Sequence, residues 1–281
     1  GSARPDLCGR PGVNPLRAKT LFHVTPEYRE LLQTLAGEID INAQHNLDVK
    51  EGFAVADKDT LRFGAHEFVE DSINRKETRP NAADLSRILA SIEEAKSQSD
   101  YCVVSVHSHE MTGEDKERPA EFIRTFARAC IDAGAGAVIG HGPHLLRGIE
   151  RYKGGVIFYS LGNFLFENDT TTHQPADFYE KYGLSSADMV GKGMTVRSRD
   201  GAIGLGANED VWRSVVASWE VTDGKTGQIR LHPIHLGMGL ARYRRGLPVL
   251  AHDDALLEHL GELSREFDTG IRIQNHIGII E

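Results

Sequence analysis

The chain has 281 residues, 40% of them hydrophobic and 26% charged, a balance that is ordinary for a folded protein with a sizeable core. Lys and Arg number 32 against 41 Asp and Glu, and the net charge of −9 disfavours nucleic acid as a partner. The three cysteines do not indicate a disulfide framework, and no apolar stretch reaches the roughly 20 residues of a membrane helix. We therefore expect one main domain, without a membrane span in this chain.

The N-terminal part predicts an arm followed by helices and short strands. Residues 1–20 hold prolines, glycines and arginines without hydrophobic periodicity and read as a connector or surface arm, so the main domain is expected over 21–281. Apolar residues at helical spacing over 26–39 predict a helix, with Thr25 as its N-cap ahead of a first-turn proline. Short strands are expected at 60–63 and 66–69, and a second helix from Asp84.

Three apolar runs in the centre of the chain predict parallel strands. Residues 101–106, 137–139 and 156–160 each suit a buried strand, and each is followed by polar or glycine-rich residues. A helix that starts at Pro119 and stops near Gly134 separates the first two runs. Alternation of strand and helix predicts an α/β sheet with a site along the carboxyl edge of its strands.

The C-terminal part predicts a long excursion, a hairpin and a closing helix. Residues 168–210 are polar and glycine-bearing, and residues 214–221 and 228–236 flank a turn-forming Asp-Gly segment. The final helix is expected over 256–267. His232 and His235 lie in the hairpin at an odd spacing that places them on opposite faces, so we interpret them as packing or surface residues.

The segment Gly140-His141-Gly142-Pro143-His144 directly follows the second run. Two histidines three apart with Gly and Pro between them do not suit a helix, but a tight turn can direct both rings to one metal or to two adjacent metals. Taken alone, such a pair more often caps strands or bonds backbone carbonyls. His107 ends the first run one strand–helix–strand unit earlier, so a right-handed crossover brings its strand beside, or one removed from, that of His141.

Several segments taken in order resemble a known family: Gly9-Arg10-Pro11-Gly12-Val13-Asn14-Pro15-Leu16, Val104-Ser105-Val106-His107-Ser108-His109-Glu110, Gly140-His141-Gly142-Pro143-His144 and Ile157-Phe158-Tyr159-Ser160-Leu161-Gly162-Asn163-Phe164. The set looks like the CapA-type family of poly-γ-glutamate synthesis, within the calcineurin-like metallophosphoesterase superfamily. The resemblance extends over roughly residues 9–240.

The resemblance implies a four-layer α/β/β/α sandwich with a dinuclear site for two divalent metal ions, Mn, Fe or Zn. It assigns His107 and His141 to one metal and His144 to the other, with no further cofactor. Two metals would lower the pKa of a bridging water and neutralise a phosphoryl group, so hydrolysis of a phosphate ester is expected. His109 and Glu110 are candidate catalytic residues that could contact substrate or orient His107. For Ser160 and Asn163 we favour structural support.

This sequence departs from the superfamily pattern at its start. The Gly-Asp and Asn-His motifs that supply a bridging carboxylate, an amide ligand and a catalytic histidine should precede Gly9, and only residues 42–48 faintly echo the second. Three explanations remain open: a chain that lacks its first half, which we favour, a divergent member with a degraded site, or an assembly whose partner supplies the ligands. The sandwich would then be incomplete at its N-terminus, and the protein either cytoplasmic or membrane-associated through an upstream segment.

Three functions follow as hypotheses. The first is a metal-dependent phosphoesterase-like hydrolase with a phosphorylated or polyanionic small molecule or polymer as substrate, whose activity in this chain alone is uncertain. The second is a non-catalytic accessory of poly-γ-glutamate synthesis or export that contacts the synthase subunits. The third is a scaffold with vestigial histidines. The specificity loops carry no readable signature of the substrate.

Overall fold

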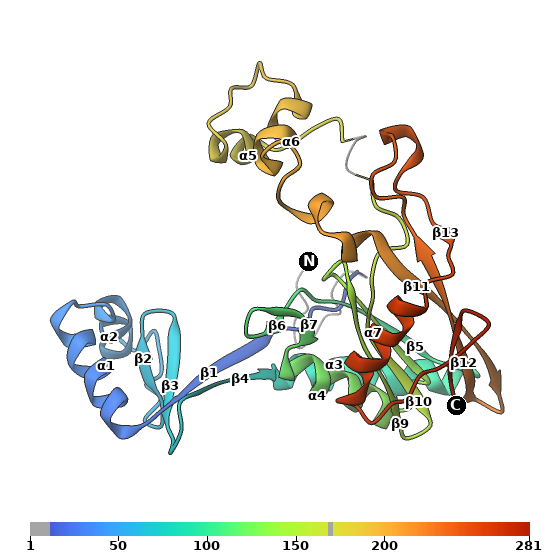
Figure 1. The fold of residues 1–281 in the computed structure, drawn as a ribbon. Coiled ribbons are helices and arrows are strands. Elements are labelled where there is room, and N and C mark those ends of the chain that lie inside the picture. The colour runs from blue at the N-terminus through green and yellow to red at the C-terminus, as the bar shows by residue number, and fades with distance from the viewer. Residues whose placement is uncertain (1–11, 168–170) are drawn as a thin grey trace. The chain divides into compact units, whose positions relative to one another are not determined.

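The computed structural model describes residues 12–167 and 171–281. The chain, for which one main domain over 21–281 was predicted, divides into two compact units: residues 1–90 with 120–126, and residues 91–119 with 127–281. Helices α3 (Ala82–Gln98) and α4 (Glu121–Asp132) begin in the first unit and end in the second. The chain is mixed α/β, as predicted, with several sheets and helices (Figure 1).

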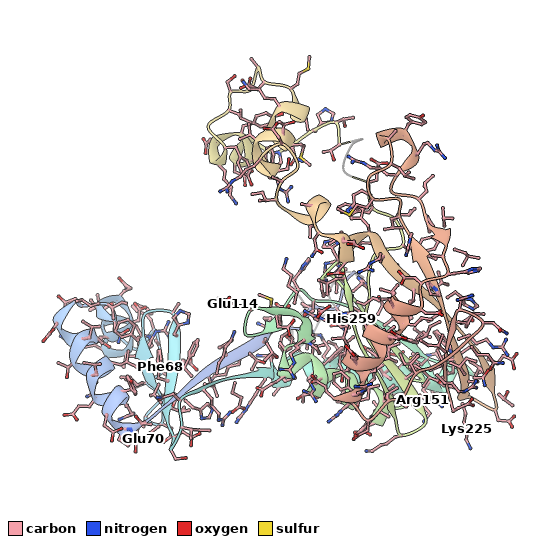
Figure 2. All side chains as sticks on the ribbon, in the orientation of Figure 1. Phe68, Glu70, Glu114, Arg151, Lys225 and His259 are labelled. Atoms are coloured by element: carbon pink, nitrogen blue, oxygen red, sulfur yellow. The ribbon has the colours of Figure 1, made fainter. Side chains whose placement is uncertain are left out.

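The first unit contains a four-stranded sheet in the order β2-β3-β1-β4, with β1 parallel to β3 and antiparallel to β4. Figure 1 shows α1 and α2 beside β2 and β3. The elements are β1 (Ala18–Val24), α1 (Pro26–Glu38), α2 (Ala43–Lys50), β2 (Leu61–Phe63), β3 (His66–Glu70) and β4 (Arg75–Pro80). Phe22 of β1 stacks on Phe68 of β3, with ring centroids 5.2 Å apart; Phe68 is labelled in Figure 2.

Helix α1 and the two short strands confirm the predictions, but three elements were missed. Thr25 occupies the N-cap position before Pro26 without a side-chain capping bond. The expected arm ends earlier than residue 20, because β1 begins at Ala18; residues 1–11 of that arm lie outside the described residues. Strand β4 and helix α2 were also missed, since both segments are polar and lack a clear hydrophobic period.

The second unit contains a four-stranded sheet in the order β5-β8-β10-β9 and a larger sheet in the order β11-β12-β15-β14, with β13 beside β12. A small hairpin pairs β6 with β7. The strands are β5 (Val103–His107), β6 (Met111–Thr112), β7 (Asp115–Pro119), β8 (Ala137–His141), β9 (Leu146–Tyr152), β10 (Gly155–Leu161), β11 (Arg213–Thr222), β12 (Lys225–His235), β13 (Val249–Leu250), β14 (Arg272–Gln274) and β15 (Ile277–Ile280). Strands β5, β8 and β10 run parallel, as predicted.

The two main sheets of the second unit share one apolar core with helix α7 (Asp254–Arg265). Ile149 of β9, Phe158 of β10 and Leu231 of β12 are fully buried in it, together with Leu257 and Leu260 of α7. Figure 1 shows α7 across the strands of the β5-β8-β10-β9 sheet. Arg151 on β9 donates to the carbonyl of Thr226 on β12, and Figure 2 shows Arg151 and Lys225 at the same end of this unit.

One central expectation was wrong in detail. Strand β5 was predicted to be a buried strand, but it lies at the edge of its sheet and its residues alternate between half-buried and exposed. Strand β9, which pairs with β10, was not predicted. The expected excursion over residues 168–210 contains α5 (Ala176–Lys181), α6 (Val190–Ser198) and the 3₁₀ turn η1 (Leu205–Ala207), and a second 3₁₀ turn, η2 (Glu209–Trp212), begins at its end. Residues 168–170 lie outside the described residues. A further 3₁₀ turn, η3, spans Arg242–Arg244.

Helices in the described residues are not long and apolar enough to cross a membrane. The predicted hairpin is confirmed by β11 and β12, whose turn carries Asp223 and Gly224 at φ values of 51° and 72°. Cys102 and Cys130 are free thiols, and burial raises the pKa of Cys130 to about 12, in keeping with a structural thiol.

Candidate functional site

His107 and His141 end neighbouring parallel strands. His107 is the last residue of β5, His141 is the last residue of β8, and the strand register pairs the two directly. Their Nδ1 atoms are 3.0 Å apart and their ring centroids 5.0 Å apart. The two predicted metal ligands therefore meet at the carboxyl edge of the sheet, as strand connectivity indicated.

The turn after β8 brings His144 back toward the same edge. Gly142 has a φ of 126°, and a Cβ at that position would come within 2.9 Å of the Ser108 carbonyl oxygen. Glycine thus lets this turn pack against the segment that follows β5. His144 has a φ of 67°, a conformation that non-glycine residues adopt at a cost and that often occurs at ligand-binding loops.

A fourth imidazole joins the other three. His109 places its Nε2 atom 3.1 Å from Nε2 of His107, and its ring centroid lies 5.6 Å from that of His144. The rings therefore form a continuous series in the order His141, His107, His109, His144. His107 and His109 are exposed, whereas His141 and His144 are half-buried. We call these four residues the histidine cluster.

Asn163 fixes the tautomer of His144. Its Nδ2 donates to the carbonyl oxygens of His144 and Val211 at 3.3 and 3.0 Å. This orientation turns Oδ1 toward Nδ1 of His144 at 2.9 Å, so Nδ1 carries the hydrogen and donates it. The lone pair of His144 is then on Nε2, the form that a metal ligand needs. The support role predicted for Asn163 thus takes the form of orienting this histidine.

Burial and neighbouring charge act in the same direction on two rings of the cluster. Burial lowers the pKa of His109, and the charges of His107 and His144 lower it further. The pKa of His141 is lowered by burial and then by the charge of His107. Both imidazoles are therefore favoured in the neutral form, which binds metals and accepts protons.

Glu110 lies at the margin of the cluster. Burial raises the pKa of its carboxyl group, but a 2.6 Å hydrogen bond from the Ser108 hydroxyl and the Glu110 backbone amide outweigh it, and the pKa falls below its usual value. Glu110 is consequently ionised at neutral pH and serves as a charged hydrogen-bond acceptor. Its carbonyl oxygen accepts a hydrogen bond from Arg147 at 3.0 Å.

Arg147 holds the segment that carries His109 and Glu110. Its side chain is 1% exposed, and it donates to the carbonyl oxygens of Glu110 and Lys116 at 3.0 and 2.8 Å. Burial lowers the pKa of Arg147 to about 10, so the guanidinium remains charged at neutral pH. A buried cation on β9 thus ties the residue before β6 and the start of β7 to the main sheet.

Imidazole nitrogens suit a divalent transition metal, but in this structure they meet only two at a time. Ligand nitrogens about 2.05 Å from one tetrahedral metal are about 3.3 Å apart, close to the 3.0 and 3.1 Å separations between His107 and its two neighbours. However, His107 faces those neighbours with opposite ring nitrogens. Within residues 12–167 and 171–281, no group of three or more His, Cys, Asp or Glu side chains is arranged to hold a metal ion. For three ring nitrogens to converge on one metal ion, the ring of His107 would have to rotate.

Sequence reasoning missed two supporting residues. Ser105 lies two residues before His107, hence on the same face of β5, and its Oγ is 2.8 Å from Nε2 of His141. The period of two along a strand could have identified it. Arg147 is a lone cation in the apolar start of β9, a signal that was present but was not used. His45, in the faint Asn-His echo, lies on α2 in the first unit.

Part of the chain matches a known protein family, and most of it is similar to two curated proteins. Residues 45–168, which contain the histidine cluster and its strands, match the bacterial capsule synthesis protein family. Two uncharacterized proteins of Sinorhizobium fredii, y4sH and y4uA, are 36% identical over 281 residues, covering 96% of this chain and 59% of each relative. The chain thus spans about three fifths of the length of these curated relatives.

Two shorter matches have named roles. The PGA biosynthesis protein CapA of Bacillus subtilis is 45% identical over 89 residues, 32% of this chain and 23% of that protein. The capsule biosynthesis protein CapA of Bacillus anthracis is 39% identical over 87 residues, 31% of this chain and 20% of that protein. Over residues 45–168 the chain therefore matches the bacterial capsule synthesis family, and together with the two CapA relatives this match supports the CapA-type family that the histidine and strand-end motifs indicated.

Proposed function

We propose that the chain serves capsule or poly-γ-glutamate synthesis as a metal-dependent, phosphoesterase-like hydrolase. The observation that carries the proposal is the histidine cluster, in which strand register and a glycine turn bring four imidazoles to one sheet edge. The two sheets that share a core in the second unit support the four-layer α/β/β/α sandwich, which remains part of the proposal.

His107, His141 and His144 would hold two divalent ions, Mn, Fe or Zn. Bound metal would supply an acidic coordinated water and positive charge for a phosphoryl group. The chain's own groups prepare the site: Asn163 keeps His144 in the required tautomer, and Arg147 fixes the backbone beside Glu110. Neutral His109 would exchange protons with a phosphorylated or polyanionic substrate, and ionised Glu110 would orient its neighbours as a hydrogen-bond acceptor.

The test is hydrolysis of p-nitrophenyl phosphate by the chain supplied with Mn²⁺. We expect metal-dependent turnover that falls by about 10²- to 10⁴-fold in His109→Ala, because a proton-transfer group is lost. His232→Ala is the matched control, since His232 belongs to a histidine pair of the same spacing in β12. Equal loss in both variants, or turnover that persists in EDTA, would contradict the hydrolase proposal.

A non-catalytic role in the same process is the second candidate. It is favoured by the opposite directions in which the nitrogens of His107 face, because the site then lacks three convergent ligands. Its partners would be the polymer and the poly-γ-glutamate synthase subunits. In a strain deleted for the gene, His141→Ala would restore full polymer output under this role and would fail to do so under the hydrolase role.

A further inference from the structure

The loop that joins β12 to β13 projects from the second unit, outside the histidine cluster. Figure 1 shows it in orange-red, extending away from the strands β11 and β12 just before β13. Its two ends are held together, because the amide of Gly246 donates to the carbonyl of Leu236 at 2.6 Å. A loop whose ends meet in this way is a compact Ω-type loop. We call residues 236–248 the β12–β13 loop.

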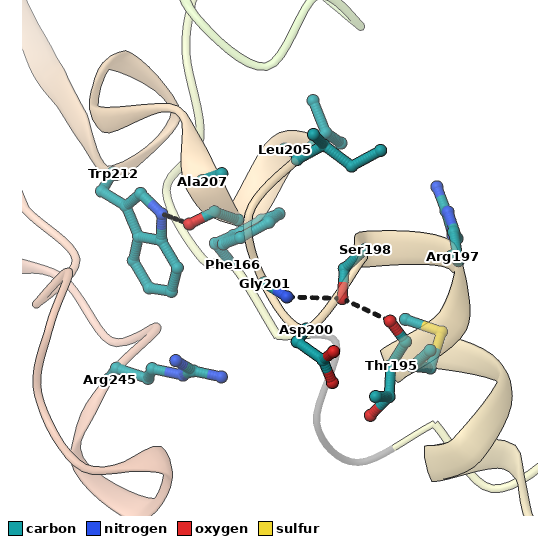
Figure 3. A pocket seen from close by; sticks show the side chains of 14 residues that line it. Phe166, Thr195, Arg197, Ser198, Asp200, Gly201, Leu205, Ala207, Trp212 and Arg245 are labelled. Atoms are coloured by element: carbon teal, nitrogen blue, oxygen red, sulfur yellow. Dashed lines mark hydrogen bonds between the residues drawn. The ribbon is translucent and has the colours of Figure 1, made fainter.

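The base of this loop is fixed to the interior of the second unit. Leu236 is fully buried in an apolar cluster with Trp212. The guanidinium carbon of Arg245 lies 5.6 Å from the centroid of the Trp212 ring, and Figure 3 shows both side chains where they line a pocket. The carbonyl of Gly246 also accepts a hydrogen bond from the amide of Phe166 at 3.0 Å. Arg245 thus serves the base of the loop, and the contacts inferred below do not use it.

Large apolar side chains of the loop and of β13 are exposed. Tyr243 is 86% exposed, Leu247 63% and Leu250 74%. The other exposed apolar side chains of the same projection are Met238, Leu240 and Val249. A single exposed apolar side chain is ordinary on a protein surface, but several on one projection indicate a contact site.

The charge of this segment is opposite to that of the whole chain. The chain has a net charge of −9, but residues 224–252 contain no Asp or Glu, and three arginines lie within the loop. Arg244 is exposed, whereas Arg197 and Asp200 of the pocket beside the base carry opposite charges that offset each other. Charges act over about 10 Å at 0.1 M salt, so a surface that meets the tip is attracted by the arginines of the loop. The loop therefore suits an anionic partner.

Exposed apolar side chains elsewhere lack this charge. Phe53, after α2 in the first unit, is 80% exposed and thus resembles Tyr243 in accessibility. It follows Glu51, however, and its amide donates to the carbonyl of Asp48 at 2.8 Å. Acidic neighbours repel an anionic surface, so the two apolar regions are not equivalent.

Apolar and cationic side chains on one projection favour a lipid surface over a protein partner. A protein interface needs a complementary shape and few charges at its core. A bilayer interface accepts apolar side chains that project one by one, Tyr is enriched there, and Arg is attracted to anionic headgroups. Buried apolar area and electrostatic attraction together give the two signals that hold a protein at such a surface.

We propose that the β12–β13 loop docks this chain on an anionic lipid surface. Tyr243, Leu247 and Leu250 would enter the boundary between headgroups and acyl chains, and Arg244 would contact lipid phosphates. The contact does not involve the histidine cluster. Vesicle binding can therefore be measured in EDTA, and its failure would leave the hydrolase proposal unaffected.

Cosedimentation with large unilamellar vesicles in EDTA tests the proposal. We expect vesicles of equal parts phosphatidylglycerol and phosphatidylcholine to bind the chain at least about tenfold more tightly than vesicles of phosphatidylcholine alone. Binding should weaken as NaCl rises from about 0.05 to 0.5 M, because salt screens the arginines.

Two substitutions separate the two contributions. Tyr243→Ser should weaken binding to the mixed vesicles by about tenfold through lost apolar burial, and Arg244→Gln by about fivefold through lost charge. The matched controls, Phe53→Ser and Lys225→Gln, should leave binding unchanged. Phe53 is the exposed aromatic residue among acidic neighbours, and Lys225 is an exposed cation at the opposite end of β12.

Thermal unfolding of all four variants checks that they remain folded. Absence of vesicle binding, or equal binding to both kinds of vesicle, would overturn the proposal. Vesicle binding that Tyr243→Ser leaves unchanged would overturn it in favour of a simple cationic patch. Tighter binding to poly-L-glutamate than to the mixed vesicles would overturn it in favour of an anionic polymer, and a dimer that Tyr243→Ser converts to monomer in analytical ultracentrifugation would do so in favour of a second copy of this chain.

Discussion

The two units of this chain are stabilised by different interactions. In the second unit, two sheets and α7 share an apolar core, and among the described residues the largest fully buried side chains all lie there. In the first unit, ion pairs surround the buried side chains of His23 and Asp84, while the apolar Leu31 of α1 is 61% exposed. The histidine cluster is thus built on the apolar scaffold, which holds ligand positions rigidly.

Besides apolar side chains such as Ile88 and Phe122, the first unit buries two charged centres. His23 places its ring nitrogens 2.8 Å from carboxylates of Asp71 and Glu77, so both nitrogens donate when both bonds form. Asp84 is 0% exposed and accepts from Arg17 and Arg87 at 2.8 Å each. Because a buried charge that loses its partner is costly, this unit depends on its ionisation state more than the second does.

The largest expected effect is a cavity in the second unit. Leu260→Ala on α7 removes a fully buried side chain from the shared core, and we expect a loss of about 2–5 kcal/mol in the free energy of unfolding. Urea denaturation followed by the fluorescence of Trp212 and Trp219, which both lie in this unit, gives the value. A change below about 1 kcal/mol would mean that the core is not shared as described.

A smaller loss is expected where a buried cation supports the site. Arg147→Met leaves the carbonyl oxygens of Glu110 and Lys116 without their donor, at a cost of about 1–3 kcal/mol. Hydrogen exchange should accelerate in β6 and β7 more than in β10. Exchange that rises equally in all three strands would show that Arg147 stabilises the whole sheet and does not hold this hairpin.

Low pH should destabilise the first unit more than the second. Hydrogen bonds from Arg79 and Arg75 outweigh the effect of burial and lower the pKa of Glu77 to about 2, and the pKa of Asp84 is lowered by its bonds to Arg17 and Arg87. A lowered carboxyl pKa stabilises the fold above the unfolded value of about 4, and that stability is lost as pH falls from about 4 toward 2.

Hydrogen exchange at pH 5 and pH 3, corrected for intrinsic rates, measures this difference. Protection of β1 in the first unit should fall several-fold more than protection of β10 in the second. The variant Glu77→Gln should reduce the difference, because an amide does not titrate. Simultaneous loss of protection in both strands would contradict the contrast between the units.

The smallest effect is expected for a leucine-to-alanine substitution at an exposed position of the first unit. Leu31→Ala on α1 is the same substitution as Leu260→Ala, made at a side chain that is 61% exposed. We expect the free energy of unfolding to change by no more than about 0.5 kcal/mol. Circular dichroism during thermal unfolding is sufficient to measure it. A loss of several kcal/mol would show that this face of α1 is covered in solution.

Sequence reasoning succeeded where patterns were local. The helical period of residues 26–39 and the Asp-Gly turn between β11 and β12 were confirmed, and the strand ends placed His107 and His141 together. It failed where the burial of a strand depends on which strands lie beside it. The exposed side chains of edge strand β5 depend on what lies beside it, and an apolar run looks the same at an edge or a centre.

Local sequence patterns also could not predict the division into two units or the hydrogen bonds that support the histidine cluster. β1 pairs with β3 and β4, which lie more than 40 residues later in the chain, so its place in a sheet could not be read from the local sequence. The bonds that Arg147 and Asn163 make to distant carbonyl oxygens depend on tertiary structure in the same way. The imidazoles could be predicted as a group, but their ring orientations could not.

Metal content after dialysis tests the central claim most directly. Elemental analysis of the chain, after incubation with Mn²⁺, Fe²⁺ or Zn²⁺, should find stoichiometric metal that is lost in His141→Ala and kept in His232→Ala. The histidine cluster would then be a metal site, with the ring of His107 reoriented on binding. Absence of retained metal in the unsubstituted chain, or equal retention in His141→Ala, would contradict the account.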